Sequence, residues 1–180
     1  IDGCVRNSEK HQQKLFRMFY GKMYAVCLRY MKDEDVAKDL VQDGFIKVFD
    51  KIGKYNHKGS FEGWMRRLIV NTCIDFIRKQ KNHFVAMDND AVMKDVDDQL
   101  RIEEGVDEQI LQIKAELAME AVQELSPAYR TVFNLYVIEN YSHREIAEIL
   151  DISEGTSKSN LAKAKQNLRK ILEDKIEKQI

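Results

Sequence analysis

Proline and glycine are scarce in this sequence, with one and eight examples among 180 residues. Both residues interrupt α-helices, so their scarcity leaves long stretches free to be helical. The three cysteines show no CxxC spacing and the four histidines are scattered, which gives no pattern of zinc ligands. We therefore predict an all-α fold with no metal site and no cofactor, in which Cys27 and Cys73 are small core residues.

Long hydrophobic runs are also absent. No uninterrupted apolar stretch approaches the roughly 20 residues that a membrane-spanning helix needs. The sequence opens with Ile1-Asp2-Gly3-Cys4 and shows no apolar segment ahead of a cleavage site, so we expect no secretory signal. These features favour a cytoplasmic protein.

The chain has no strong excess of one charge, which argues against a uniformly basic nucleic-acid-binding protein. Its formal net charge is −1, but the charges are segregated along the sequence. Residues 51–81 hold eight basic and two acidic side chains. Residues 88–108 hold two basic and nine acidic side chains, and residues 158–170 hold five basic and no acidic ones. This order indicates two basic surfaces separated by an acidic connector.

Apolar residues at spacings of three and four predict three helices in the first part of the chain. One stripe runs over residues 15–30 and a second over residues 36–52, with an acidic break between them. Residues 53–60 lack this periodicity and form a predicted loop before a third helix over residues 61–77.

Residues 83–110 are polar, acidic and weakly patterned. Such a segment buries too little apolar surface to order itself, so we expect a flexible linker. The sequence therefore predicts two small helical domains, residues 1–82 and 111–180, on either side of this acidic linker.

The second domain carries sharp helix-start signals. Ser126 is a predicted N-cap with Pro127 in the first helical position, and this helix is expected to run through Tyr136. Ser142 and Glu145 then have the spacing of a capping box, in which the serine caps the third amide and the glutamate reaches back. A short helix should follow to residue 150.

The last predicted helices form a recognisable unit. Residues 151–153 make a predicted tight turn, and a longer basic helix follows over residues 154–172. A short capped helix, a tight turn and a basic helix are typical of a helix-turn-helix, whose second helix enters the major groove by its N-terminal end. Lys158 and Lys163 would contact bases or phosphates there, although either lysine taken alone fits an ordinary solvated face.

The predicted third helix has a second candidate nucleic-acid surface. Arg67, Asn71, Asp75 and Arg78 share its polar face at spacings of four, four and three residues. The loop before it, Lys54-Tyr55-Asn56-His57-Lys58, combines cations with an aromatic ring, which suits stacking of an unpaired base beside its phosphates. Tyr55 fits either base contact or loop packing, whereas Trp64 fits a packing role better.

The segment Asp39 to Phe49 places Asp39, Gln42 and Asp43 beside a strongly apolar stripe. A helix of this kind can bury one face and offer the other to a partner helix. Taken alone, the segment fits an amphipathic core helix with a solvated edge better than a partner-binding helix.

Several of these segments, in their order and spacing, resemble the extracytoplasmic-function sigma factors. Residues 39–49 look like the family's core-polymerase-binding helix, and residues 61–72 look like its F-x-x-W-L-x-R-I-A-x-N segment at the minus-ten element. Residues 125–127, 141–147 and 155–159 resemble the domain that reads the minus-thirty-five element.

The resemblance implies three sets of site residues. Those facing core RNA polymerase would be Asp39, Gln42, Asp43, Phe45, Lys47 and Phe49. Those at the minus-ten element of promoter DNA would be Lys54, Tyr55, Asn56, Lys58, Arg66, Arg67, Asn71, Arg78 and Lys79. Those at the minus-thirty-five element would be Arg144, Gly155, Thr156, Ser157, Lys158, Ser159, Asn160 and Lys163.

By the same resemblance the chain would direct promoter-specific initiation and trap melted DNA, while catalysis would belong to the polymerase, so it would be no enzyme and would take no small-molecule substrate. It would also have an inhibitory anti-sigma partner, often membrane-bound. Two positions depart from the family: Ser157 stands where an apolar residue is usual, and Asn160 where arginine is frequent.

Two other functions fit parts of the sequence. A conventional helix-turn-helix transcription regulator explains the second domain but leaves the basic helix with Trp64 and Asn71 unassigned. A nucleic-acid enzyme would need clustered carboxylates or an activated nucleophile, whereas the acidic residues concentrate in the unpatterned linker.

Overall fold

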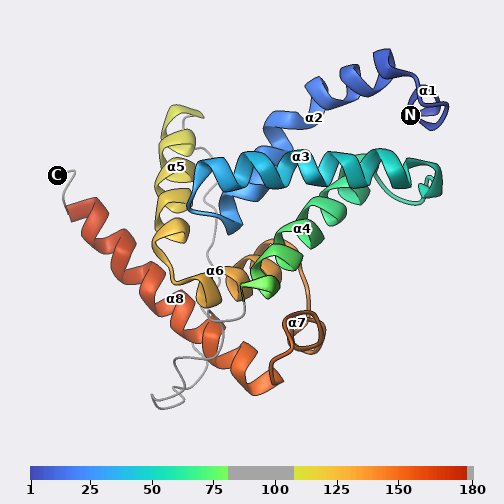
Figure 1. The fold of residues 1–180 in the computed structure, drawn as a ribbon. Coiled ribbons are helices and arrows are strands. Elements are labelled where there is room, and N and C mark those ends of the chain that lie inside the picture. The colour runs from blue at the N-terminus through green and yellow to red at the C-terminus, as the bar shows by residue number, and fades with distance from the viewer. Residues whose placement is uncertain (81–107, 178–180) are drawn as a thin grey trace. The chain divides into compact units, whose positions relative to one another are not determined.

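The computed structural model describes residues 1–80 and 108–177, and within these residues every regular element is a helix (Figure 1). This confirms the all-α prediction. The chain divides into two compact units, Ile1–Lys81 and Asn82–Ile180. The predicted linker falls outside the described residues, except that its last three positions belong to a helix that begins at Glu108.

Unit 1, residues 1–81, is built on three long helices that all pack against one another. A short α1 (Asp2–Val5) leads into α2 (Glu9–Tyr30), α3 (Glu34–Lys51) and α4 (Phe61–Lys79). A single 3-10 turn, Ile52–Lys54, starts the loop before α4. The helix ends follow local signals: the side chain of Asp33 accepts hydrogen bonds at the start of α3, and Ser60 accepts one from the amide of Gly63 in α4.

The core of unit 1 lies between these three helices. Cys27 of α2 and Cys73 of α4 are buried there with their sulfur atoms 3.7 Å apart, as small core residues. The hydrogen bond that the Cys73 thiol donates to the Cys27 sulfur, together with burial, raises the pKa of Cys73. Gly44 of α3 faces Ile69 of α4 so closely that a Cβ on Gly44 would collide with the Ile69 side chain. Glycine therefore sets the distance between α3 and α4.

Unit 2 consists of α5 (Glu108–Glu124), α6 (Pro127–Phe133), α7 (His143–Leu150) and α8 (Glu154–Glu177). The long α8 packs against the other three helices (Figure 1). One cluster of the core joins α5, α6 and α8, and its buried members are Ala121, Val122, Leu125, Tyr129, Ala164 and Leu168.

The helix predicted to run through Tyr136 is present, but its last turn is not α-helical. The α-helix ends at Phe133, and Asn134–Ile138 form a π-helical turn, η2. The wider turn buries the side chains of Asn134 and Leu135 while it leaves Tyr136 exposed. Apolar spacing did not predict this π-helical turn, because such a turn adds only one residue to a pattern that otherwise has α-helical spacing.

Candidate nucleic-acid interface

The outer edge of α3 is the first candidate interface. Asp39, Gln42 and Asp43 are exposed on one face, as predicted for a partner-binding strip. Ile46 extends the same face by one turn and is 59% exposed, so it adds an apolar side chain to the polar strip. Sequence reasoning missed Ile46, although its spacing of seven, four and three residues from the polar positions could have identified it.

Phe45 does not belong to this strip, contrary to the expectation that it faces a partner. It is 2% exposed, and its ring centroid lies 4.7 Å from that of Phe16 and 6.0 Å from that of Phe49. Its position in the helix places it with the buried residues Val41 and Val48, so it holds α3 in the core. Phe49 is half-buried at a surface hollow that it shares with Phe16.

Lys47 is also predicted for this surface, but its side chain contacts α4 as well as solvent. Its Nζ lies 3.3 Å from a carboxylate oxygen of Asp75. Both side chains are partly exposed, so the pair contributes little to stability. It does reduce the negative charge of Asp75 within the polar strip of α4.

That strip of α4 is exposed as the sequence predicts. Arg67, Asn71 and Arg78 point away from the core along one side of the helix. Lys79 is exposed at the end of the helix, and Arg66 is half-buried. The strip therefore presents cationic and amide donors that can contact phosphates and base edges.

The loop before α4 is organised by Tyr55. Its hydroxyl donates a hydrogen bond to the carbonyl oxygen of Gly59 at 2.7 Å, and its ring lies 5.2 Å from Phe61 and 5.5 Å from Trp64. Asn56 accepts a hydrogen bond from the amide of Lys58 at 3.1 Å.

The ring cluster includes Trp64, which is half-buried, in agreement with a packing role. Lys54, Asn56 and Lys58 are exposed around the half-buried Tyr55 ring. The loop thus offers an aromatic face with cations beside it.

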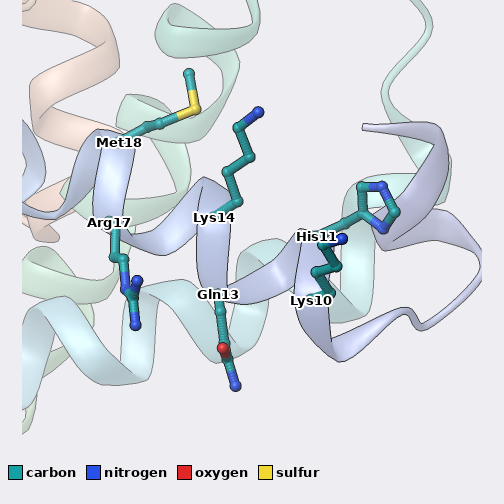
Figure 2. A pocket seen from close by; sticks show the side chains of 6 residues that line it. All are labelled: Lys10, His11, Gln13, Lys14, Arg17 and Met18. Carbon is teal, nitrogen blue, oxygen red and sulfur yellow. The ribbon is translucent and has the colours of Figure 1, made fainter.

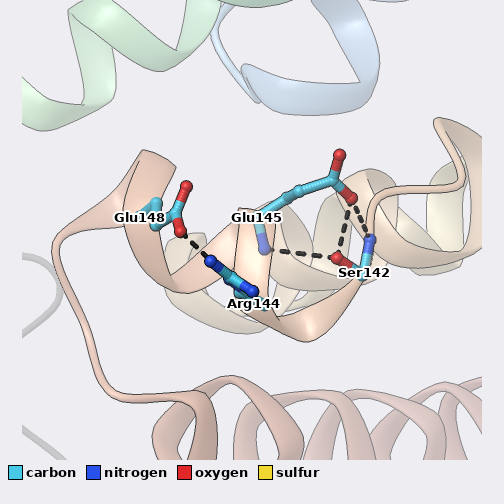
Figure 3. Close-up of polar contacts among 4 residues, drawn as sticks. All are labelled: Ser142, Arg144, Glu145 and Glu148. Carbon is cyan, nitrogen blue, oxygen red and sulfur yellow. Dashed lines mark hydrogen bonds and ion pairs between the residues drawn. The ribbon is translucent and has the colours of Figure 1, made fainter.

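In unit 2, α7 and α8 form the predicted helix-turn-helix. The capping box at α7 is complete, because Ser142 accepts from the amide of Glu145 and the Glu145 carboxylate accepts from both the amide and the hydroxyl of Ser142 (Figure 3). These hydrogen bonds lower the pKa of Glu145. Asp151 takes the left-handed conformation with φ 57°, and Ser153 accepts from the amide of Thr156 at 2.9 Å.

The leading end of α8 presents most of the predicted residues. Gly155 and Lys158 are exposed, and a second group is half-buried along the same end: Thr156, Ser159, Asn160 and Lys163. Arg144 is exposed on α7 and lies 3.4 Å from Glu148 one turn later (Figure 3).

Ser157 is the exception at this end, and its predicted contact with DNA is wrong for this structure. The residue is 0% exposed and its hydroxyl is hydrogen-bonded to Nδ1 of His143 at 2.9 Å. It occupies the stripe that buries Leu161 and Ala164, so the core and not the groove receives it. The apolar residue that is usual here in the resembled family fits the same location.

A surface hollow with a volume of about 630 Å³ lies elsewhere, along α2. All six residues that line it come from one helix, and Figure 2 shows Lys14 and Met18 on one side with Gln13 and Arg17 on the other. No second element brings a side chain to it, so it is a groove beside a helix and not an enclosed site.

Two features are absent from the part of the chain that the structure describes. It contains no group of three or more His, Cys, Asp or Glu residues that could hold a metal ion. None of its helices is long and apolar enough to cross a membrane.

Two families match this chain, one in each unit. The family described as Sigma-70 region 2 matches residues 15–83, and the one described as Sigma-70, region 4 matches residues 115–168. The first range contains α3 and α4 with their candidate surfaces, and the second contains the helix-turn-helix.

Similar proteins match over nearly the whole length. The chain is 29% identical to the ECF RNA polymerase sigma factor SigW of Bacillus subtilis, over 94% of this chain and 95% of that protein. It is 27% identical to SigM of the same organism, over 87% and 91%. A solved sigma factor, RpoE of Bartonella quintana in complex with the anti-sigma factor NepR, has a similar fold with a TM-score of 0.50 and 21% identity, over 91% of this chain and 98% of that one.

Proposed function

Because this chain belongs to the extracytoplasmic-function branch of the sigma-70 family of RNA polymerase sigma factors, we propose that its two units divide promoter recognition between them. A sigma factor is not an enzyme; it binds core RNA polymerase and promoter DNA. The observation that carries the division is that each compact unit contains one of the two matched regions, in the order region 2 and region 4.

In unit 1, α3 docks on core polymerase through its exposed strip of Asp39, Gln42, Asp43 and Ile46. The strip combines an exposed apolar side chain with polar neighbours, which is the composition of an interface centre with its rim. Phe45 supports this strip from inside the core and makes no contact with the partner.

The loop and the strip of α4 read the minus-ten element and hold it open. Arg67, Asn71 and Arg78 contact the backbone and base edges, while the loop around Tyr55 receives an unpaired base. Capture of an extruded base offsets part of the few kcal/mol that unstacking costs. The chain can therefore trap melted DNA without breaking a bond.

In unit 2, α8 enters the major groove at the minus-thirty-five element. The residues at its leading end, among them the exposed Lys158, supply donors for phosphates and bases. Arg144 is exposed near the start of α7, the first helix of the helix-turn-helix, and adds a phosphate contact.

We also propose that the protein acts in the cytoplasm, where polymerase is, and that an anti-sigma partner covers these same surfaces. Occupation of the α3 strip would block polymerase, and occupation of α4 or α8 would block DNA. RpoE of Bartonella quintana, which has a fold similar to that of this chain, was solved in complex with the anti-sigma factor NepR, and this supports the proposal of such a partner.

Docking is tested by co-elution with core RNA polymerase and by promoter-dependent run-off transcription. The test variant changes Asp39, Gln42 and Ile46 together to alanine. Its matched control changes Glu173, Asp174 and Ile176, which are also two exposed polar residues and one exposed isoleucine, the latter 53% exposed. Loss of both readouts in the first variant alone is expected; equal activity of the two variants would contradict the docking assignment.

DNA opening is tested with permanganate, which reacts with unpaired thymines. Asn71→Ala should reduce reactivity in the minus-ten region while co-elution with polymerase remains. Gln80→Ala, which removes an exposed amide at the end of the same helix, should change neither. Normal reactivity with Asn71→Ala would remove this residue from the minus-ten surface.

A further inference from the structure

The hydrogen bond between His143 and Ser157 links the two helices of the helix-turn-helix. His143 is the first residue of α7, and Ser157 lies in the first turn of α8 with no exposed surface. Nδ1 of His143 and the Ser157 hydroxyl are 2.9 Å apart. The Tyr136 ring of η2 stacks on the imidazole, with centroids 4.4 Å apart and 24° between the planes. Three consecutive elements thus meet at one imidazole ring.

The position of Ser157 relates this contact to the DNA-facing residues. Ser157 shares the buried stripe of α8 with Leu161, Ala164 and Leu168. At 3.6 residues per turn, Ser159 and Lys163 project from the opposite side of the helix. The rotation of α8 at which its buried stripe packs against the core therefore determines the direction in which Ser159 and Lys163 point.

Small rotations of α8 about its own axis move the ends of its side chains appreciably. A rotation of about 20° carries the end of a side chain by about 2 Å, because side chains extend roughly 5–6 Å from the axis. Hydrogen bonds to base edges tolerate only a few tenths of an ångström around about 2.9 Å. A helix that binds DNA without this rotational control would lose base contacts before it lost phosphate contacts.

An apolar contact and a hydrogen bond control rotation differently. Apolar burial is non-directional, so a stripe of Leu and Ala tolerates some rotation and sliding. A buried hydrogen bond has a preferred distance and angle, and leaving either partner unsatisfied is costly. The His143–Ser157 contact therefore restricts α8 to a narrower range of orientations than the apolar stripe alone.

We propose that His143 and Ser157 are positioning residues, which orient α8 so that the residues at its leading end discriminate the upstream promoter element from other DNA. This inference rests on the proposed function of unit 2. Neither residue contacts DNA; they act through Lys158, Ser159, Asn160 and Lys163.

The test uses the full chain assembled with core RNA polymerase. The probe is a promoter fragment that the wild-type holoenzyme enriches from a library randomised in the upstream element, and the comparison fragment has that element scrambled. The readout is the dissociation constant for the scrambled fragment divided by that for the promoter fragment, so a high ratio means strong discrimination. A variant that merely unfolds a fraction of the protein weakens binding to both fragments equally and leaves this ratio unchanged.

Ser157→Ala should lower the ratio by about two- to tenfold, the effect of losing one net hydrogen bond, with affinity for the scrambled fragment unchanged. His143→Asn should keep most of the ratio, because its amide can occupy the location of Nδ1. Thr131→Val is the matched control: it removes another buried hydroxyl of unit 2, which donates to the Pro127 carbonyl at 2.7 Å inside α6. It should lower the melting temperature and leave the ratio unchanged.

The double variant His143→Leu/Ser157→Ala separates positioning from stability. Replacing both partners by apolar groups removes the unsatisfied atoms, so the melting temperature should recover relative to Ser157→Ala while the ratio stays low. Recovery of both quantities would overturn the inference, because any apolar packing would then suffice. An unchanged ratio in Ser157→Ala would overturn it as well. A wild-type holoenzyme that fails to distinguish the two fragments would instead contradict the proposed function of unit 2.

Discussion

Replacement of Phe45 by alanine separates the core of unit 1 from its docking surface. The side chain is 2% exposed and contacts the rings of Phe16 and Phe49. Loss of a buried phenylalanine costs about 3–5 kcal/mol, through lost transfer free energy and the cavity that remains. The whole stability of a small domain is only about 5–15 kcal/mol, so the variant should lose a large fraction of it.

Trp64 provides the assay, because it is the only tryptophan in the sequence and lies in unit 1. Its fluorescence in urea follows unit 1 alone. With a slope of about 1–3 kcal/mol per molar urea, the Phe45→Ala midpoint should fall by roughly 1–5 M. Ile46→Ala, one residue away and 59% exposed, should keep the wild-type midpoint but weaken polymerase binding. A wild-type midpoint for Phe45→Ala would refute the placement of this ring in the core.

Three further outcomes are expected. Gly44→Ala should lower the urea midpoint of the Trp64 signal, because the new methyl group meets Ile69 and overpacking costs about 1–3 kcal/mol. Gly21→Ala has no atom within 4 Å of the new Cβ, and should raise the same midpoint, since alanine favours an exposed helix by about 0.5–1 kcal/mol. Glu145→Gln should lower the melting temperature of unit 2, followed by circular dichroism, at neutral pH. The folded pKa of Glu145 is lowered, so its contribution is present above the ordinary glutamate pKa and is lost as the pH falls through the folded value. The difference between the two proteins should therefore vanish in acid, and a difference that persists there would contradict this origin.

Most helices of the described residues were predictable because their boundaries are encoded locally. The capping box of Ser142 and Glu145, the N-cap Ser126 and the turn at Asp151 each depend on residues within four positions. Such signals act before any tertiary contact forms, so the sequence alone indicates where these helices begin. The helix-turn-helix followed from them directly.

The residues at the edges of the apolar stripes could not be assigned in the same way. Phe45 and Ile46 are adjacent and both apolar; helical spacing groups Ile46 with the polar positions, but the packing of α2 and α4 on α3 is what buries the first and leaves the second exposed. Ser157 is polar and occurs among DNA-facing residues, yet the hydrogen bond with His143, 14 positions away, makes its burial possible. Both outcomes depend on a partner that is distant in sequence.

The same geometry separates stability from function along a single helix. In α3 the buried stripe of Val41, Phe45 and Val48 lies opposite the exposed strip of Asp39, Gln42 and Ile46. An alanine scan through α3 should therefore give two series with the helical period, in which losses of stability and losses of polymerase binding alternate. If both losses fell on the same positions, polymerase binding would depend on the intact core of unit 1 and not on a separate surface of α3.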